Sequence, residues 1–123
     1  MIFKNEIDKV LKILKINKPK FIKNKYMAFS YVPKIDTIFY YDYEYNKTLF
    51  LIIHELRHKY QYVYNKNIFT YNKYYYNSVS ELDAYFFSYY VIRNIFNINY
   101  ELSFPLNDIL REYINECFIK DMV

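Results

Sequence analysis

The chain has 123 residues, a net charge of +4 and no glycine. This length supports one domain, residues 1–123, with a single modest hydrophobic core. The absence of glycine excludes a phosphate-binding loop, a GxGxxG dinucleotide-binding turn and an EF-hand, because each needs glycine where the backbone turns sharply or approaches a ligand.

The first half of the chain predicts one helix and a short β-ribbon. Apolar residues recur at helical spacing over 4–16, with lysines between them, which indicates an amphipathic helix. Residues 26–32 and 35–43 are rich in aromatic and β-branched residues and are separated by Pro33-Lys34. We therefore expect these two segments to pair as a hairpin or β-ribbon.

The second half predicts helices. Asn46 is a plausible N-cap for a helix over 47–64, and apolar residues on both sides of this helix indicate that it is buried between layers. We expect a loop over 65–77 and further helices over 78–96 and 106–120. The complete order predicts a mainly helical α+β domain. Cys117 is the single cysteine and lies on the apolar stripe of the last helix, where we expect a buried thiol.

Charge is concentrated near the N-terminus. Residues 1–25 contain eight lysines against Glu6 and Asp8. Such a segment is able to contact nucleic acid or an anionic membrane surface, although a solvated helix face followed by a basic linker explains it equally simply. No signal peptide and no apolar run long enough to span a bilayer is visible, so we expect a soluble, cytoplasmic protein.

The chemistry is concentrated in the string His54-Glu55-Leu56-Arg57-His58, which contains the only two histidines of the chain. Residues four apart lie on the same face of a helix, so both imidazoles are able to reach one metal ion. Glu55 lies one residue further round the helix, beside the ion rather than on it. There it is placed to take a proton from a metal-bound water.

Two histidines leave a catalytic zinc site one protein ligand short. Glu81 is the first candidate, because it opens the next predicted helix and lies far enough along the chain for a loop and a return. Ser78 and Glu81 also match a capping box, in which Glu81 would only bind the backbone N–H of Ser78. Asp83 is the reserve candidate, and Cys117 is a weaker one. Small Ala84 would allow the two helices to approach closely.

The HExxH string followed by Glu81 and Ala84 in a helical ExxA pattern resembles the gluzincin zinc metallopeptidases. The small size is similar to that of the minigluzincins, which are minimal relatives of CAAX-type membrane peptidase cores, and to small phage-encoded HExxH proteins. The resemblance is close over about 47–95. It implies a zincin-like minimal domain with an N-terminal helix, a β-ribbon, an active-site helix, a glutamate helix and a C-terminal helix. It also implies Zn²⁺ held by His54, His58 and Glu81, with Glu55 as the general base.

The resemblance carries further expectations. The strand over about 36–42 would be an edge strand that binds substrate as an added antiparallel strand. A tyrosine would stabilise the oxyanion, since no further histidine is present. Many such families have Asp after ExxA, where it supports a ligand histidine. Tyr85 stands at that position here, and its hydroxyl is able to serve the same purpose.

The sequence therefore predicts a zinc-dependent metalloendopeptidase that hydrolyses a peptide or protein substrate, with no nucleic-acid partner expected. One alternative is a non-catalytic binding module, stabilised by metal or associated with nucleic acid through residues 1–25. A latent enzyme, with its metal covered by a terminal segment, is a third. Two imidazoles and a carboxylate also suit iron or cobalt, so the pattern leaves the identity of the metal open.

Overall fold

The computed structural model describes residues 2–64 and 79–100 and shows a mainly helical α+β fold, as predicted. The expected loop over 65–77 and the expected helix over 106–120, with Cys117, lie outside the described residues. The elements in chain order are α1 (Lys4–Leu14), β1 (Lys20–Lys23), β2 (Ser30–Val32), the 3₁₀ turn η1 (Pro33–Ile35), β3 (Thr37–Tyr40), α2 (Tyr45–Tyr64), α3 (Val79–Tyr90) and the π-helical turn η2 (Val91–Ile95).

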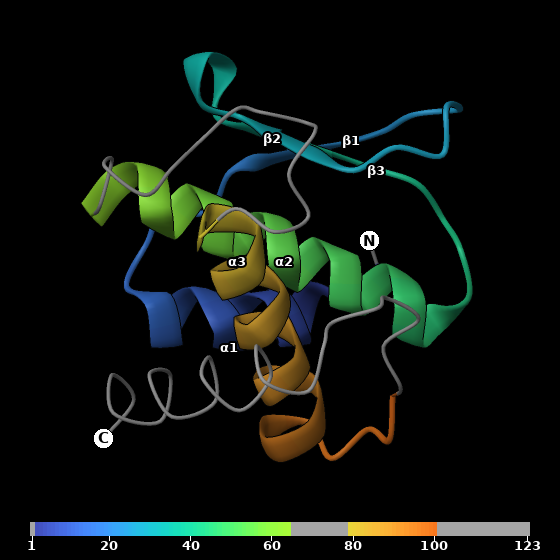
Figure 1. Ribbon diagram of the computed structural model, residues 1–123. Helices are drawn as coiled ribbons and strands as arrows, with labels where there is room; N and C mark the ends of the chain where they lie inside the picture. Colours follow the sequence, from blue (N-terminus) through green and yellow to red (C-terminus); the bar gives the residue numbers. More distant parts are fainter. Residues whose placement is uncertain (1, 65–78, 101–123) are drawn as a thin grey trace.

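Helix α2 crosses the middle of the fold. In Figure 1 the sheet lies on one side of α2, α1 on the other, and α3 crosses in front. Every residue of α2 from Ile52 to Lys59 is buried, including the charged ones. The prediction of a helix enclosed between layers is confirmed. A polar group in this part of α2 therefore needs a partner from a neighbouring element.

Helix α1 covers α2 with one apolar face. Its buried residues are Ile7, Val10, Leu11 and Leu14, which lie at helical spacing. The helix ends at Lys15, which adopts a left-handed conformation and donates its backbone N–H to the Leu11 carbonyl. The lysines of this helix remain on the outer side, as the alternation in the sequence predicts.

The sheet has the order β1-β3-β2, with β3 parallel to β1 and antiparallel to β2. The predicted ribbon is confirmed, because it consists of β2 and β3. The expectation that 36–42 forms an edge strand is wrong: β1, which lies in the segment interpreted as a basic linker, pairs with the other side of β3. The two edge strands are β1 and β2.

Tight turns occur without glycine. Within residues 2–64 and 79–100, four non-glycine residues have positive φ: Lys15 at 56°, Met27 at 59°, Asp36 at 46° and Asn97 at 56°. Asn and Asp tolerate this left-handed region better than other residues, whereas Lys and Met pay a steric cost. In the β1–β2 connection the Asn24 side chain accepts the N–H of Tyr26, which holds the turn in place.

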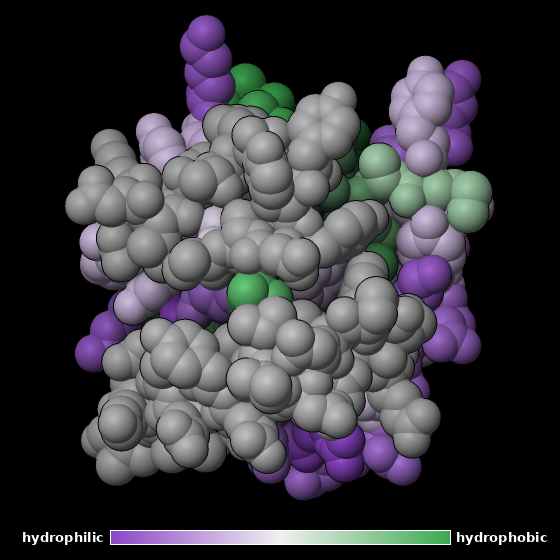
Figure 2. Space-filling view, in the orientation of Figure 1, coloured by the Kyte–Doolittle hydropathy of each residue, from purple (hydrophilic) through white to green (hydrophobic). Residues whose placement is uncertain are grey.

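The surface of the sheet carries exposed apolar side chains. Ile22 of β1 and Ile35 of η1 are among the exposed large hydrophobic residues. Figure 2 shows apolar surface at the upper edge of the molecule, over the sheet. No helix among the described residues is long and apolar enough to cross a membrane.

Candidate metal centre

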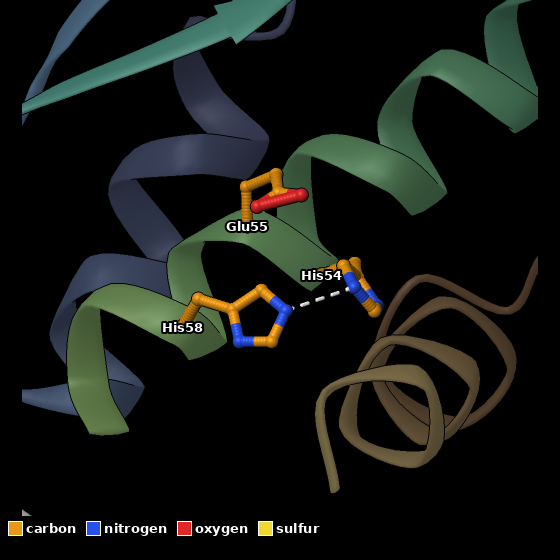
Figure 3. A group of neighbouring side chains, drawn as sticks. All are labelled: His54, Glu55 and His58. Atoms are coloured by element: carbon orange, nitrogen blue, oxygen red, sulfur yellow. Dashed lines mark hydrogen bonds between the residues drawn. The ribbon is translucent and has the colours of Figure 1, made fainter. Parts of the chain in front are cut away.

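His54, Glu55 and His58 lie in the buried middle of α2, each with 6% or less of its surface exposed. Figure 3 shows the two imidazoles on the side of α2 that faces α3, with Glu55 directed toward the sheet. The Nε2 atoms of His54 and His58 are 3.1 Å apart, and the rings meet at 86°. Both nitrogens therefore point toward the same place, as the spacing of four residues predicts.

Glu81 on α3 completes this group. Its Oε1 lies 2.7 Å from Nε2 of His58, and its Oε2 lies 3.1 Å from Nε2 of His54. The structure thus brings together the three residues that the sequence analysis selected as metal ligands. Both oxygens of Glu81 face the imidazoles, so the three side chains lie together at one place between α2 and α3. The alternative partner in the capping-box interpretation, Ser78, lies outside the described residues.

The separations between these donor atoms suit a zinc-like ion. Tetrahedral zinc with bonds of about 2.0–2.1 Å separates neighbouring ligand atoms by about 3.3 Å. The observed separations of 2.7 and 3.1 Å between His54, His58 and Glu81 differ from this by a few tenths of an ångström. Two imidazoles and one carboxylate also form a donor set typical of catalytic zinc.

The contact between Glu81 and His58 favours the charged form of each side chain, a carboxylate on Glu81 and an imidazolium on His58. Burial alone would raise the pKa of Glu81, but its hydrogen bonds to His54 and His58 hold that pKa well below its usual range. Burial alone would lower the pKa of His58, but the hydrogen bond to Glu81 and the charge of Glu55 raise it to about 9. The Glu81 carboxylate is therefore ionised at neutral pH, in the form that binds a metal.

Glu55 occupies a different position from Glu81. A carboxylate oxygen of Glu55 lies within 4.8 Å of the ligand atoms of both histidines. The backbone N–H of Tyr31 on β2 donates a hydrogen bond to this carboxylate, while burial raises the pKa of Glu55. A buried carboxylate beside the imidazoles, with an elevated pKa, is suited to accept and release a proton.

A hydrogen-bonded group that the sequence analysis missed lies behind His58. The Oε1 of Gln61 is 2.8 Å from Nδ1 of His58, and the Nε2 of Gln61 is 2.8 Å from Oδ2 of Asp83. Asp83 also forms a two-point ion pair with Arg57, at 2.8 and 3.1 Å. The reserve candidate Asp83 therefore serves this group rather than the cluster of Nε2 atoms.

His54, the other predicted ligand histidine, has different surroundings. The ring of Tyr85 packs against the ring of His54, with centroids 4.0 Å apart. Among the described residues, Nδ1 of His54 is buried and has no hydrogen-bond partner. Tyr85 therefore contacts His54 through its ring, and a role for its hydroxyl in supporting a ligand histidine stays a prediction.

A separate cavity of about 350 Å³ lies near the C-terminal end of α2. Lys59 is buried there and forms an ion pair with Asp36, at 2.9 Å, and Tyr31 donates its hydroxyl to the same carboxylate. None of the three predicted metal ligands lines this cavity. Its polar groups bind each other and connect η1 and β2 to α2.

No family model, curated protein or solved structure matches this chain. The chemistry of the site must therefore support any functional conclusion.

Proposed function

We propose that this protein is a zinc-dependent peptidase of the gluzincin type that hydrolyses peptide bonds in a peptide or protein substrate. The observation that supports this most directly is the contact of both Glu81 oxygens with the Nε2 atoms of His54 and His58. The adjacent carboxylate of Glu55 supplies the proton acceptor that a hydrolase of this class needs.

In this proposal His54, His58 and Glu81 hold the ion. Bound there, zinc would supply Lewis-acid chemistry that makes a nearby water more acidic, toward a pKa of ~7, and polarises a substrate carbonyl. Glu55 accepts the proton of the attacking water and then donates it to the amine that leaves. The hydrogen bond from the Tyr31 N–H holds the Glu55 carboxylate in position for both transfers.

Strand β2 is the best candidate for substrate binding. Among the described residues it is an edge strand of the sheet and pairs with β3. Tyr31 lies in this strand and contacts Glu55 through its backbone. A substrate that lies alongside β2 would therefore pass close to the proposed general base.

The Glu55→Gln variant tests the proposal. It should bind zinc as wild type does, because Glu55 is not among the three ligands, and its peptide hydrolysis should fall at least about 100-fold. Zinc content is measured by mass spectrometry of the purified protein, and hydrolysis by a library of fluorogenic peptides. Glu44→Gln, at an exposed position before α2, is the matched control and should retain full activity.

Two results would contradict the proposal. Hydrolysis retained by Glu55→Gln would exclude Glu55 as the general base. Zinc-loaded wild-type protein that cleaves neither the peptide library nor unfolded proteins would exclude a peptidase and favour a non-catalytic metal site.

A further inference from the structure

The amide of Gln61 is completely buried, and all of its hydrogen-bonding positions are occupied. Its Nε2 lies 2.9 Å from the backbone carbonyl of Ser80 and 2.8 Å from Oδ2 of Asp83. Its Oε1 lies 2.8 Å from Nδ1 of His58 and 2.8 Å from Oγ of Ser80. A glutamine with two acceptors and two donors, each paired, is held in one orientation.

This orientation decides which nitrogen of His58 carries a proton. The carbonyl and the carboxylate that face Nε2 of Gln61 are acceptors only, so the NH₂ group must face them. The Oε1 of Gln61 therefore faces His58, and as an acceptor it requires a proton on Nδ1. When His58 is in its neutral form, Nε2 is then the nitrogen whose lone pair is available to a metal.

The same amide also connects the two helices of the site. Ser80 and Asp83 lie on α3 on either side of Glu81, while Gln61 and His58 lie on α2. Arg57 holds Asp83 from α2 through its two-point ion pair. The contacts that hold the Gln61 side chain therefore form only when α3 packs against α2 in the position that also brings Glu81 to His58.

We propose that Gln61 is a positioning residue for the metal centre, which fixes His58 with its proton on Nδ1 and aligns it with Glu81. This inference depends on the metal-binding part of the proposed function and not on peptide hydrolysis. Hydrogen-bonding partners of this kind behind a ligand histidine contribute about 10–100-fold to metal affinity.

The competing explanation is that Gln61 only stabilises the packing of α2 against α3. The chain contains a matched example of such a contact, because Ser88 of α3 is also fully buried and donates its hydroxyl to the Phe50 carbonyl of α2. In contrast with Gln61, Ser88 has no hydrogen bond to a predicted metal ligand in the described part of the chain.

Three variants separate the two explanations. Gln61→Met keeps the length of the side chain but removes the acceptor, and its zinc dissociation constant should rise about 10–100-fold. Gln61→Glu keeps an acceptor for Nδ1 of His58 but places a carboxylate against Asp83, so it should lose stability and retain its zinc affinity. Ser88→Ala should likewise lose stability without a change in zinc affinity.

Zinc affinity is measured by competition with a chromogenic chelator, and stability by urea unfolding of the metal-free proteins. The visible spectrum of the Co²⁺-loaded proteins reports the ligand geometry and should change in Gln61→Met alone. Should that variant not fold, Ser80→Ala removes one of the two hydrogen bonds to Oε1 and should still weaken zinc binding more than Ser88→Ala does.

The inference would be overturned if the loss of zinc affinity in each variant were proportional to its loss of stability. The result is independent of the enzymatic proposal: a wild-type protein that binds zinc but cleaves nothing refutes the peptidase and leaves the role of Gln61 standing. A Gln61→Met variant that keeps both its peptidase activity and its zinc affinity would refute the role of Gln61 and leave the peptidase proposal standing.

Discussion

Two glutamates beside the same pair of histidines have pKa shifts in opposite directions. Glu81 accepts hydrogen bonds from both imidazoles, which lowers its pKa, whereas burial raises the pKa of Glu55. A permanently ionised carboxylate is suited to hold a cation, and a carboxylate that protonates more easily is suited to proton transfer. The difference in contacts supports the two roles proposed above, with Glu81 as a metal ligand and Glu55 as the proton acceptor.

Replacing Glu81 tests its role as the third ligand. Glu81→Gln removes the anionic donor and should lower zinc affinity by at least about 100-fold, whereas a capping residue would cost only about 1 kcal/mol of stability. The metal content of the purified variant and its urea unfolding curve distinguish these outcomes. A variant that keeps its zinc and loses only stability would show that Glu81 acts as a helix cap.

At the residue level, the sequence predicts the ligands better than their supports. His54 and His58 are selected by local helical spacing, and Glu81 by the need for a third donor. Gln61 follows His58 by three residues on the same face, which is the one signal that points to it. Its partners Ser80 and Asp83 come from α3, so their contacts depend on tertiary packing that no local pattern reveals.

Buried charge is the main feature of α2 as an element. Arg57 has a side chain that is only 10% exposed, and it pairs with Asp83 on α3 while its guanidinium lies over the rings of Tyr60 and Phe87. Lys59 is buried on another side of the helix and pairs with Asp36. These pairs specify how α2 meets each neighbour, because an unpaired charge in either place would be costly.

The Arg57–Asp83 pair should therefore be much more important for stability than an exposed pair. Asp83→Asn leaves the buried guanidinium without its counter-charge and should lower the free energy of unfolding by about 3 kcal/mol. Asp42→Asn is the matched control: it breaks the Lys23–Asp42 pair, whose side chains are both more than half exposed, and should have little effect. Equal losses in the two variants, measured by urea unfolding, would contradict this assignment.

At the level of elements, periodicity predicts the helices within a few residues of their observed limits. The predicted 47–64 corresponds to Tyr45–Tyr64, and 4–16 to Lys4–Leu14. Strand β1 was not predicted from the sequence. It has only four residues, two of them lysine, and its pairing with β3 connects segments that are distant in sequence. Sheet order depends on such non-local pairing, so the sequence did not reveal that β3 is central.

For the molecule as a whole, a metal bound by His54, His58 and Glu81 would join α2 to α3. An ion that binds the folded state and not the unfolded state adds its binding free energy to stability. The effect should depend on pH, because zinc requires neutral imidazole while the pKa of His58 is raised to about 9 in the metal-free protein. Zinc must then displace a proton from His58 at neutral pH.

The direction of this pH dependence follows from the shift. Protonated His58 contributes fully to the stability of the metal-free fold below about pH 6.5, and this contribution is lost as the pH rises through about 9. The stabilisation that zinc adds should instead increase with pH. At fixed free zinc, the added free energy of unfolding should rise by about 1.4 kcal/mol per pH unit between about pH 6 and 8. Thermal unfolding with buffered zinc, compared with chelator-treated protein, measures the difference. An increment that does not vary with pH would show that His58 is not a ligand.

The turns of this glycine-free chain also influence how the protein is able to evolve. Lys15 and Met27 occupy left-handed conformations that cost about 1 kcal/mol or more in a residue with a side chain. Met27 is exposed and lies in the connection between β1 and β2, away from the metal centre. A lineage that acquired glycine at such turns would gain stability, and with it tolerance for destabilising changes around the histidines.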